Sequence, residues 1–182
     1  MSNKHWKTIS SETVISNYYA TVKKNNVELP NGNRLDDFYT VKIHDSVCVV
    51  ALTKSNEIIL KREYRYCYDE ELYEIPGGVY EHYEKDSLTA AKRELVEETG
   101  YYSTEWEFIA KTIENPSKLT NFNYIYYAKN CEKVSEQKLD QNEEIEVLVI
   151  PFSQAIEMVM NNEIITNCAA QAILTVARKI GV

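Results

Sequence analysis

Apolar and β-branched residues gather in short segments along the first half of the chain, with turn-forming residues between them. These segments are predicted to be strands, and they cover residues 14–24, 38–43, 46–53 and 57–64. The Asn31-Gly32 pair and the Asp45-Ser46 junction supply turn chemistry. The first half is therefore predicted to form antiparallel hairpins, with Cys48–Ala51 in a central, buried strand.

The apolar period changes in the second half of the chain. From about Asp86 to Thr99, apolar residues recur three and four positions apart, which predicts an amphipathic helix. Asp86 or Ser87 is a suitable N-cap, and Gly100 stands just past the end. Further strands are predicted over residues 106–113, 122–129 and 145–151, and further helices over residues 153–161 and 167–179.

The length and order of these elements predict one mixed α+β domain. The chain has 182 residues, of which 44% are hydrophobic, which suffices for one well-buried core. No repeat, low-complexity tract or linker interrupts the order of elements. We expect an N-terminal strand extension over residues 1–43 and the main domain over residues 44–182.

The charge of the chain restricts the class of partner. The formal net charge is −8, the sequence pI is about 5.0, and there is no block of basic residues. Binding to nucleic acid or to an anionic membrane is therefore not expected. A small phosphate ligand is compatible with this charge, because divalent cations and a few arginines can bind it. Residues 1–10 lack the apolar stretch of a signal peptide, so we expect a cytoplasmic protein.

Cysteine and histidine offer no site in this sequence. The four cysteines are widely scattered, which is typical of reduced thiols, and the three histidines share no metal-binding spacing. No motif of a serine or cysteine nucleophile is present. Any chemistry must therefore come from carboxylates.

Three carboxylates share one side of the helix predicted after residue 86. At roughly 100° per residue, Glu94, Glu97 and Glu98 flank the apolar stripe of that helix. Carboxylates crowded at the margin of a core repel one another and resist loss of water unless a cation neutralises them. Hard divalent cations with oxygen ligands fit best, so the sequence predicts Mg²⁺ or Mn²⁺.

Residues next to these carboxylates complete the predicted site. Arg93 stands four positions before Glu97, where it can pair with that carboxylate and orient it. Gly77 and Gly78 leave the segment before the helix free of side chains, so a backbone carbonyl or a phosphate can approach the metal.

The segment from Gly77 to Tyr101 resembles the Nudix box. That pattern is Gly, five residues, Glu, seven residues, Arg-Glu-hydrophobic, any residue, Glu-Glu, any residue, Gly-hydrophobic. The matching residues are Gly78, Arg93, Glu94, Leu95, Glu97, Glu98, Gly100 and Tyr101. One position departs from it: eight residues separate Glu84 from Arg93, so Lys85 occupies the register of the first Glu. Glu84 is the candidate substitute, shifted by one loop residue.

The resemblance implies a Nudix-type α/β/α sandwich with a central mixed sheet. The segments Lys61–Arg65 and Glu74–Gly78 look like those that precede the box in the ADP-ribose pyrophosphatase branch of the family. In that branch the N-terminal strands contact a second subunit, which implies a homodimer here. The substrate contacts that we expect from this likeness are Arg62, Arg65, Glu74, Phe38, Tyr39 and Tyr64.

The resemblance also implies metal-dependent hydrolysis of a diphosphate by in-line attack of water on phosphorus. The expected metal ligands are Glu94, Glu97, Glu98 and the backbone carbonyl of Gly78. Glu97 and Arg93 would serve catalysis. A further carboxylate must accept the proton of the water, and Glu143 is the first choice and Glu144 the second.

Several alternatives stay open. An isolated Arg-Glu-x-x-Glu-Glu is usually a solvated helix surface, and Arg62 and Arg65 can be plain surface charge. ADP-ribose, split into AMP and ribose 5-phosphate, is the leading substrate, with an ADP- or GDP-hexose as the rival, because residues 115–121 differ from the segment often found in ADP-ribose hydrolases. A nucleotide-sensing module without catalysis and a structural dimerisation protein are the alternatives from other classes.

Overall fold

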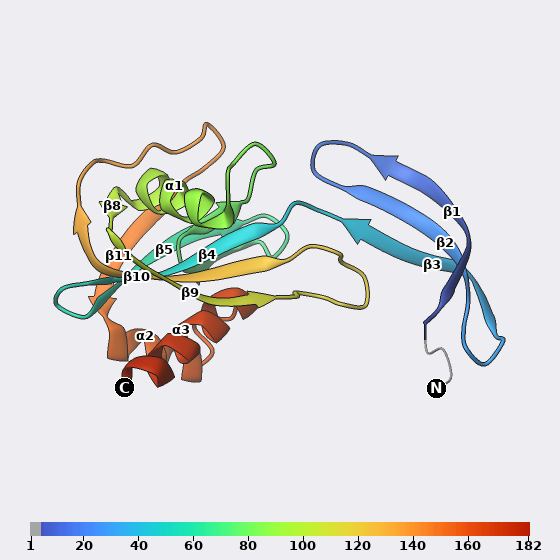
Figure 1. Cartoon of the computed structure of the whole chain (residues 1–182). Helices are drawn as coiled ribbons and strands as arrows, with labels where there is room; N and C mark the ends of the chain where they lie inside the picture. Colours follow the sequence, from blue (N-terminus) through green and yellow to red (C-terminus); the bar gives the residue numbers. More distant parts are fainter. Residues whose placement is uncertain (1–4) are drawn as a thin grey trace. The chain divides into compact units, whose positions relative to one another are not determined.

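The structure is a computed structural model that describes residues 5–182. Residues 1–4, which belong to the segment considered for a signal peptide, lie outside the described residues. The chain forms two compact units, one with residues 1–44 and 113–122 and the other with residues 45–112 and 123–182. Each unit has a β-sheet of its own (Figure 1).

The N-terminal unit is built on a three-stranded antiparallel sheet. Its strands are β1 (Lys7–Ser16), β2 (Thr21–Glu28) and β3 (Arg34–Lys42), in the order β1-β2-β3. The prediction of one strand over residues 14–24 was wrong, because a turn divides that segment: Asn17 Oδ1 accepts hydrogen bonds from the backbone N–H groups of Tyr19 and Ala20. The predicted turn at Asn31-Gly32 is confirmed, and Gly32 has a φ of +85°.

The larger unit contains a mixed sheet of eight strands. These are β4 (Ser46–Thr53), β5 (Glu57–Arg65), β6 (Glu70–Glu74), β7 (Gly77–Val79), β8 (Tyr101–Tyr102), β9 (Glu105–Thr112), β10 (Asn123–Lys133) and β11 (Ile145–Pro151). The main order is β11-β5-β4-β10-β8, with β6 paired to β5, β7 to β4 and β9 to β10. Only β4 and β10 run parallel among the described pairs. The predicted central position of Cys48–Ala51 is confirmed, since β4 lies in the middle.

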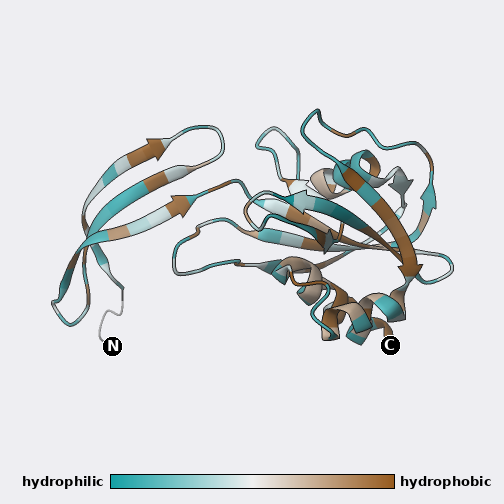
Figure 2. Cartoon of the chain, turned by 180° about the vertical axis from the view of Figure 1, so that it is seen from behind, coloured by the Kyte–Doolittle hydropathy of each residue, from teal (hydrophilic) through white to brown (hydrophobic). Residues whose placement is uncertain are grey.

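Helices cover both faces of this sheet (Figure 1). They are α1 (Ser87–Thr99), α2 (Phe152–Met160) and α3 (Asn167–Ile180). Residues of β4 alternate between the two faces: Val47 and Val49 pack with α1, whereas Val50 and Leu52 pack with α2 and α3. The predicted α/β/α arrangement is therefore present. Figure 2 shows hydrophobic and hydrophilic segments interleaved on α2 and α3, as expected for helices with one buried face.

The start and end of α1 follow the sequence closely. Asp86 is the N-cap, and its side chain accepts a 2.8 Å hydrogen bond from the N–H of Thr89. Gly100 ends the helix in the left-handed region with a φ of 73°, where a side chain would be strained. The short strands β6, β7 and β8 were not predicted. No described helix has the length and apolar character needed to span a bilayer.

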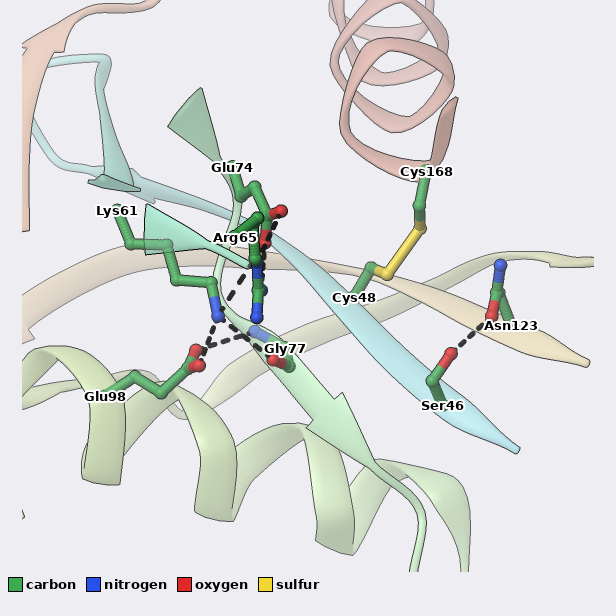
Figure 3. Close-up of a disulfide and its surroundings, with 9 residues drawn as sticks. All are labelled: Ser46, Cys48, Lys61, Arg65, Glu74, Gly77, Glu98, Asn123 and Cys168. Atoms are coloured by element: carbon green, nitrogen blue, oxygen red, sulfur yellow. Dashed lines mark hydrogen bonds and ion pairs between the residues drawn. A yellow bond between two sulfur atoms is a disulfide. The ribbon is translucent and has the colours of Figure 1, made fainter. Parts of the chain in front are cut away.

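Two cysteines depart from the prediction of reduced thiols. Cys48 on β4 and Cys168 on α3 form a disulfide, although 120 positions separate them in the sequence (Figure 3). Cys67 and Cys131 are free. The prediction was wrong for the first pair because sequence spacing does not reveal which residues the packing of α3 on β4 brings together.

Candidate active site

The segment β7 lies against α1 through two glycines. A side chain at Gly77 would collide with the backbone carbonyl of Val47 on β4. At Gly78, a Cβ atom would lie 2.5 Å from Oε1 of Glu94 on α1. Gly77 therefore accepts no side chain, and a side chain at Gly78 would displace the Glu94 carboxylate, so the two glycines bring the backbone of β7 up to the carboxylates of the helix.

Arg93 on α1 binds several groups beside the contact between β7 and α1. Its Nε lies 2.9 Å from Oε1 of Glu84, and its Nη1 lies 2.9 Å from Glu94 Oε1 and 3.0 Å from Glu97 Oε2. Its Nη2 also donates a 3.0 Å hydrogen bond to the carbonyl of Val79. The loop residue Glu84 therefore reaches the cluster despite its shifted register, because the loop before α1 folds back onto Arg93.

The carboxylate of Glu94 is buried beside other negative charges. Burial raises the pKa of Glu94 to about 7, and Arg93 opposes this shift while Glu98 and Glu97 add to it. A buried carboxylate with like charges around it is stabilised by an additional cation.

A second cluster forms around Lys61, which exposes only 2% of its surface to solvent. Its ammonium group forms an ion pair with Oε1 of Glu98, whose Oε2 accepts a 2.8 Å hydrogen bond from the N–H of Gly77 (Figure 3). Lys61 Nζ also lies 3.3 Å from Glu63 Oε2 and 4.0 Å from Glu74 Oε2. Burial alone would lower the pKa of Lys61, but these carboxylates raise it, so the ammonium group remains charged.

The two clusters together carry an excess of negative charge. The carboxylates are Glu63, Glu74, Glu84, Glu94, Glu97 and Glu98, and the basic side chains are Lys61, Arg65 and Arg93. Six carboxylates against three basic groups give a formal charge of −3 when all are ionised. Carboxylate oxygens are the donors that Mg²⁺ and Mn²⁺ prefer, so the residues present fit a divalent cation.

In the part of the chain that the structure describes, no three acidic, cysteine or histidine side chains surround one common point as preformed metal ligands. Glu94 and Glu97 point instead to Arg93, and Glu98 points to Lys61. Each of these carboxylates therefore has a basic partner within the two clusters.

The loop with the predicted base is attached to the end of α1. The N–H of Lys138 donates a 2.8 Å hydrogen bond to the carbonyl of Glu97, and Gln137 Nε2 donates one of the same length to the carbonyl of Glu98. Within the loop, Glu143 Oε2 accepts a 3.0 Å hydrogen bond from the N–H of Asp140. The structure thus brings this loop to the end of α1. The Oε2 atom of Glu143 is hydrogen-bonded within the loop, and Glu144 is exposed.

The predicted substrate arginines are engaged with carboxylates. Arg62 pairs with Glu146 on β11, and Arg65 binds both oxygens of Glu74 at 3.0 and 2.5 Å. Arg65 and Glu74 therefore belong to the cluster around Lys61, whereas Arg62 lies on the exposed side of β5.

The predicted aromatic contacts divide between the two units. Tyr64 is half exposed at the end of β5 and donates a 2.8 Å hydrogen bond to Asp69. Phe38 and Tyr39 belong to β3 of the N-terminal unit, where Phe38 packs edge-on against Trp6 and lies under the ammonium group of Lys118.

Sequence reasoning missed Lys61 as a member of the site. A signal was present: Lys61 follows the apolar run Ile58–Leu60 in a predicted strand. Since strand residues alternate, Lys61 must point to the same face as Ile59, which packs beneath α1. A lysine that faces a helix rich in carboxylates is a candidate ion-pair partner.

Two family models match the chain. Residues 42–167 match the NUDIX domain, and residues 6–41 match the nucleoside diphosphate sugar hydrolase N-terminal domain. The first match covers more than half of the chain and contains β7, α1 and the loop that precedes β11.

Known proteins resemble the chain over most of its length. An ADP-ribose pyrophosphatase of Bacillus subtilis is 30% identical over 174 residues, which cover 95% of this chain and 93% of that protein. A methanol dehydrogenase activator of Bacillus methanolicus is 30% identical over 159 residues, with coverage of 87% and 85%. The solved structure of an ADP compounds hydrolase shares the fold, with a TM-score of 0.82 and 21% identity over 97% of this chain and 96% of that one. With glycines, carboxylates and Arg93 arranged as described, the chain belongs to the Nudix family and is a pyrophosphatase that hydrolyses nucleoside diphosphate derivatives.

Proposed function

We propose that this enzyme hydrolyses ADP-ribose to AMP and ribose 5-phosphate and depends on Mg²⁺ or Mn²⁺. The observation that carries the proposal is the acidic face of α1 packed against the Gly77-Gly78 backbone, with more carboxylates than basic groups around it. The ADP-ribose pyrophosphatase of Bacillus subtilis, which is similar over nearly the whole chain, supports this choice of substrate.

The metal ligands of the proposal are Glu94, Glu97, Glu98 and the carbonyl of Gly78. A bound divalent cation supplies positive charge that polarises the phosphate and lowers the pKa of a water molecule. Arg93 keeps Glu94 and Glu97 in fixed rotamers through its ion pairs with both.

The reaction is a simple displacement at phosphorus. The oxygen of a water molecule bonds to one phosphorus of the diphosphate, and the bond from that phosphorus to the bridging oxygen breaks. Glu143 or Glu144 accepts the proton of the water, since their loop is attached to α1 at Glu97 and Glu98. Arg62 and Arg65 bind the substrate phosphates or ribose by exchanging their present carboxylate partners, and Tyr64 contacts the adenine.

A panel of substrates tests this proposal. The purified protein is incubated with Mg²⁺ or Mn²⁺ and with ADP-ribose, ADP-glucose, GDP-mannose and ATP, and the products are identified by chromatography. We expect AMP and ribose 5-phosphate as the fastest products. The Glu97→Gln variant should stay folded and lose turnover by about 100-fold or more, whereas Glu136→Gln, at an exposed glutamate outside the cluster, should keep full activity. Equal activity of wild type and Glu97→Gln would rule out this site.

A nucleotide sugar is the second candidate substrate. The match of residues 6–41 to the N-terminal domain of nucleoside diphosphate sugar hydrolases favours it. In the same panel, faster hydrolysis of ADP-glucose or GDP-mannose than of ADP-ribose would select this alternative and leave the proposed site unchanged.

A further inference from the structure

Lys61 is a charged residue inside the core of the larger unit. It lies on β5, its side chain is 2% exposed, and Ile58, Ile59 and Leu60 immediately before it are fully buried. Because β5 pairs with β6 and β11 on either side, the surroundings of Lys61 are packed strands and the helix α1. An apolar side chain would suit such a position, so a lysine there requires an explanation.

Stability does not provide that explanation. A buried ion pair loses the hydration of both ions, and its replacement by apolar residues is often neutral or stabilising. The contacts of Lys61 point elsewhere: its nearest partner is the Oε1 atom of Glu98, and it also donates a 3.4 Å hydrogen bond to the carbonyl of Gly77. Figure 3 shows this ammonium group between Glu98 and the backbone of β7.

The two oxygens of Glu98 are held from different directions. Lys61 binds Oε1, and the N–H of Gly77 donates to Oε2 over 2.8 Å. Glu98 itself is buried, and its charge acts on Glu94 one helical turn earlier. A carboxylate with both oxygens fixed in this way cannot turn away from Glu94 when like charges repel it.

We propose that Lys61 is a positioning residue for the hydrolytic reaction. Its ammonium group acts as a built-in counter-cation of Glu98. It holds the Glu98 carboxylate beside Glu94, and its positive charge offsets part of the negative charge that otherwise attracts divalent cations. This inference rests on the proposed function, in which Glu98 is a metal ligand. Lys61 itself touches neither substrate nor metal.

The test uses the full-length protein and three variants. Lys61→Met removes the charge at nearly the same length, and Lys61→Arg keeps the charge. Lys54→Met is the matched control, because Lys54 forms an exposed ion pair with Glu132 away from this cluster. Binding of Mn²⁺ is measured by electron paramagnetic resonance without substrate, and kcat and KM are measured with the best substrate of the panel.

We expect Lys61→Met to lower kcat by about 10- to 100-fold, as for residues that orient metal ligands, with little change in KM. The Lys61→Met variant should bind Mn²⁺ about tenfold more tightly, with a lower Kd, because a nearby positive charge is removed. Lys61→Arg should keep the wild-type Kd for Mn²⁺ and recover part of kcat, and Lys54→Met should match the wild type in both. If Lys61→Met does not fold, Lys61→Gln provides the same comparison, with the charge removed and a hydrogen-bond donor kept.

Two results would overturn the inference. One is a Lys61→Met or Lys61→Gln protein with the kcat of the wild type, which would leave Lys61 with a structural role only. The other is unchanged or weaker Mn²⁺ binding in the neutral variant. Failure of the proposed function looks different, because the wild type would then hydrolyse no member of the panel and bind no Mn²⁺.

Discussion

At the scale of single residues, the site consists of carboxylates that the fold removes from water. Glu98 and Glu94 are buried, whereas the side chain of Glu97 is 42% exposed. The exposed Glu97 can therefore change partners easily. The buried Glu94 and Glu98 are instead neutralised and oriented by Arg93, Lys61 and the N–H of Gly77. This gradient from buried to exposed explains how one helix face serves both folding and chemistry.

The raised pKa of Glu94 predicts a dependence of stability on pH in the metal-free protein. The folded pKa of about 7 lies above the ordinary value of 4.5, so the folded state holds this proton more tightly than the unfolded chain. The resulting stability is fully present below pH 4.5 and is lost as the pH rises through 7. A shift of this size corresponds to about 3 kcal/mol.

The Glu94→Gln variant removes this titration and tests the prediction. Thermal unfolding with a chelator should show the variant gaining stability relative to the wild type between pH 5 and pH 8. The control is Glu136→Gln, for which the difference should stay constant. A pH-independent difference for Glu94→Gln would contradict the assigned pKa.

At the scale of elements, the helix α1 and the strand β7 define the site, and α3 is fixed to β4 from the other face. Cys48 on β4 stands opposite Gly77 in the pairing of β4 with β7, and Cys168 lies near the start of α3. The disulfide therefore joins the strand that supports the site to a helix distant in sequence.

Reduction of this disulfide should destabilise the enzyme. A crosslink across 120 positions restricts the unfolded chain and contributes about 4 to 5 kcal/mol in the loop-entropy description. We expect dithiothreitol to lower the Tm of the wild type by several degrees and to leave the Tm of Cys168→Ser unchanged. Cys67→Ser is the control, since Cys67 is exposed and free. Equal Tm values with and without dithiothreitol for the wild type would show that the bond does not form in solution.

At the scale of the whole molecule, the N-terminal unit exposes several apolar side chains on β1 that we propose are covered by a second copy of the chain. Every residue of β1 is exposed, including Ile9, Val14 and Ile15. A sheet with exposed β-branched residues is suited to contact between subunits. The match to an N-terminal domain typical of nucleoside diphosphate sugar hydrolases agrees with a separate role for this unit.

A charge placed on this surface should disrupt the proposed homodimer. We expect light scattering to give the mass of two chains for the wild type and of one chain for Ile15→Lys at micromolar concentration, because the charge would be buried without a partner. Glu136→Lys, at an exposed position of the larger unit, is the control. A wild type that remains monomeric would refute the homodimer.

Much of the larger unit follows from local patterns. The helix α1 was predicted with Asp86 or Ser87 as its N-cap and Gly100 just past its end, and β11 was predicted with its observed bounds, because these features depend on neighbouring residues. The strands β6, β7 and β8 are too short for a period to be recognised, and the break after Ser16 depends on a side-chain hydrogen bond of Asn17. Local signals therefore succeed for α1 and β11, and they fail for very short strands and for a strand end that depends on one side-chain hydrogen bond.

The sequence by itself determined the carboxylate-bearing helix, the glycines before it and the family, because the spacing of residues along one helix and one loop fixes which side chains share a face. Only the tertiary structure decided that Lys61 binds Glu98, that Glu84 reaches Arg93 and that Cys48 bonds to Cys168. These partners come from different elements, and sheet pairing and the packing of helices on the sheet bring them together. Such contacts depend on three-dimensional packing, which residue spacing does not encode.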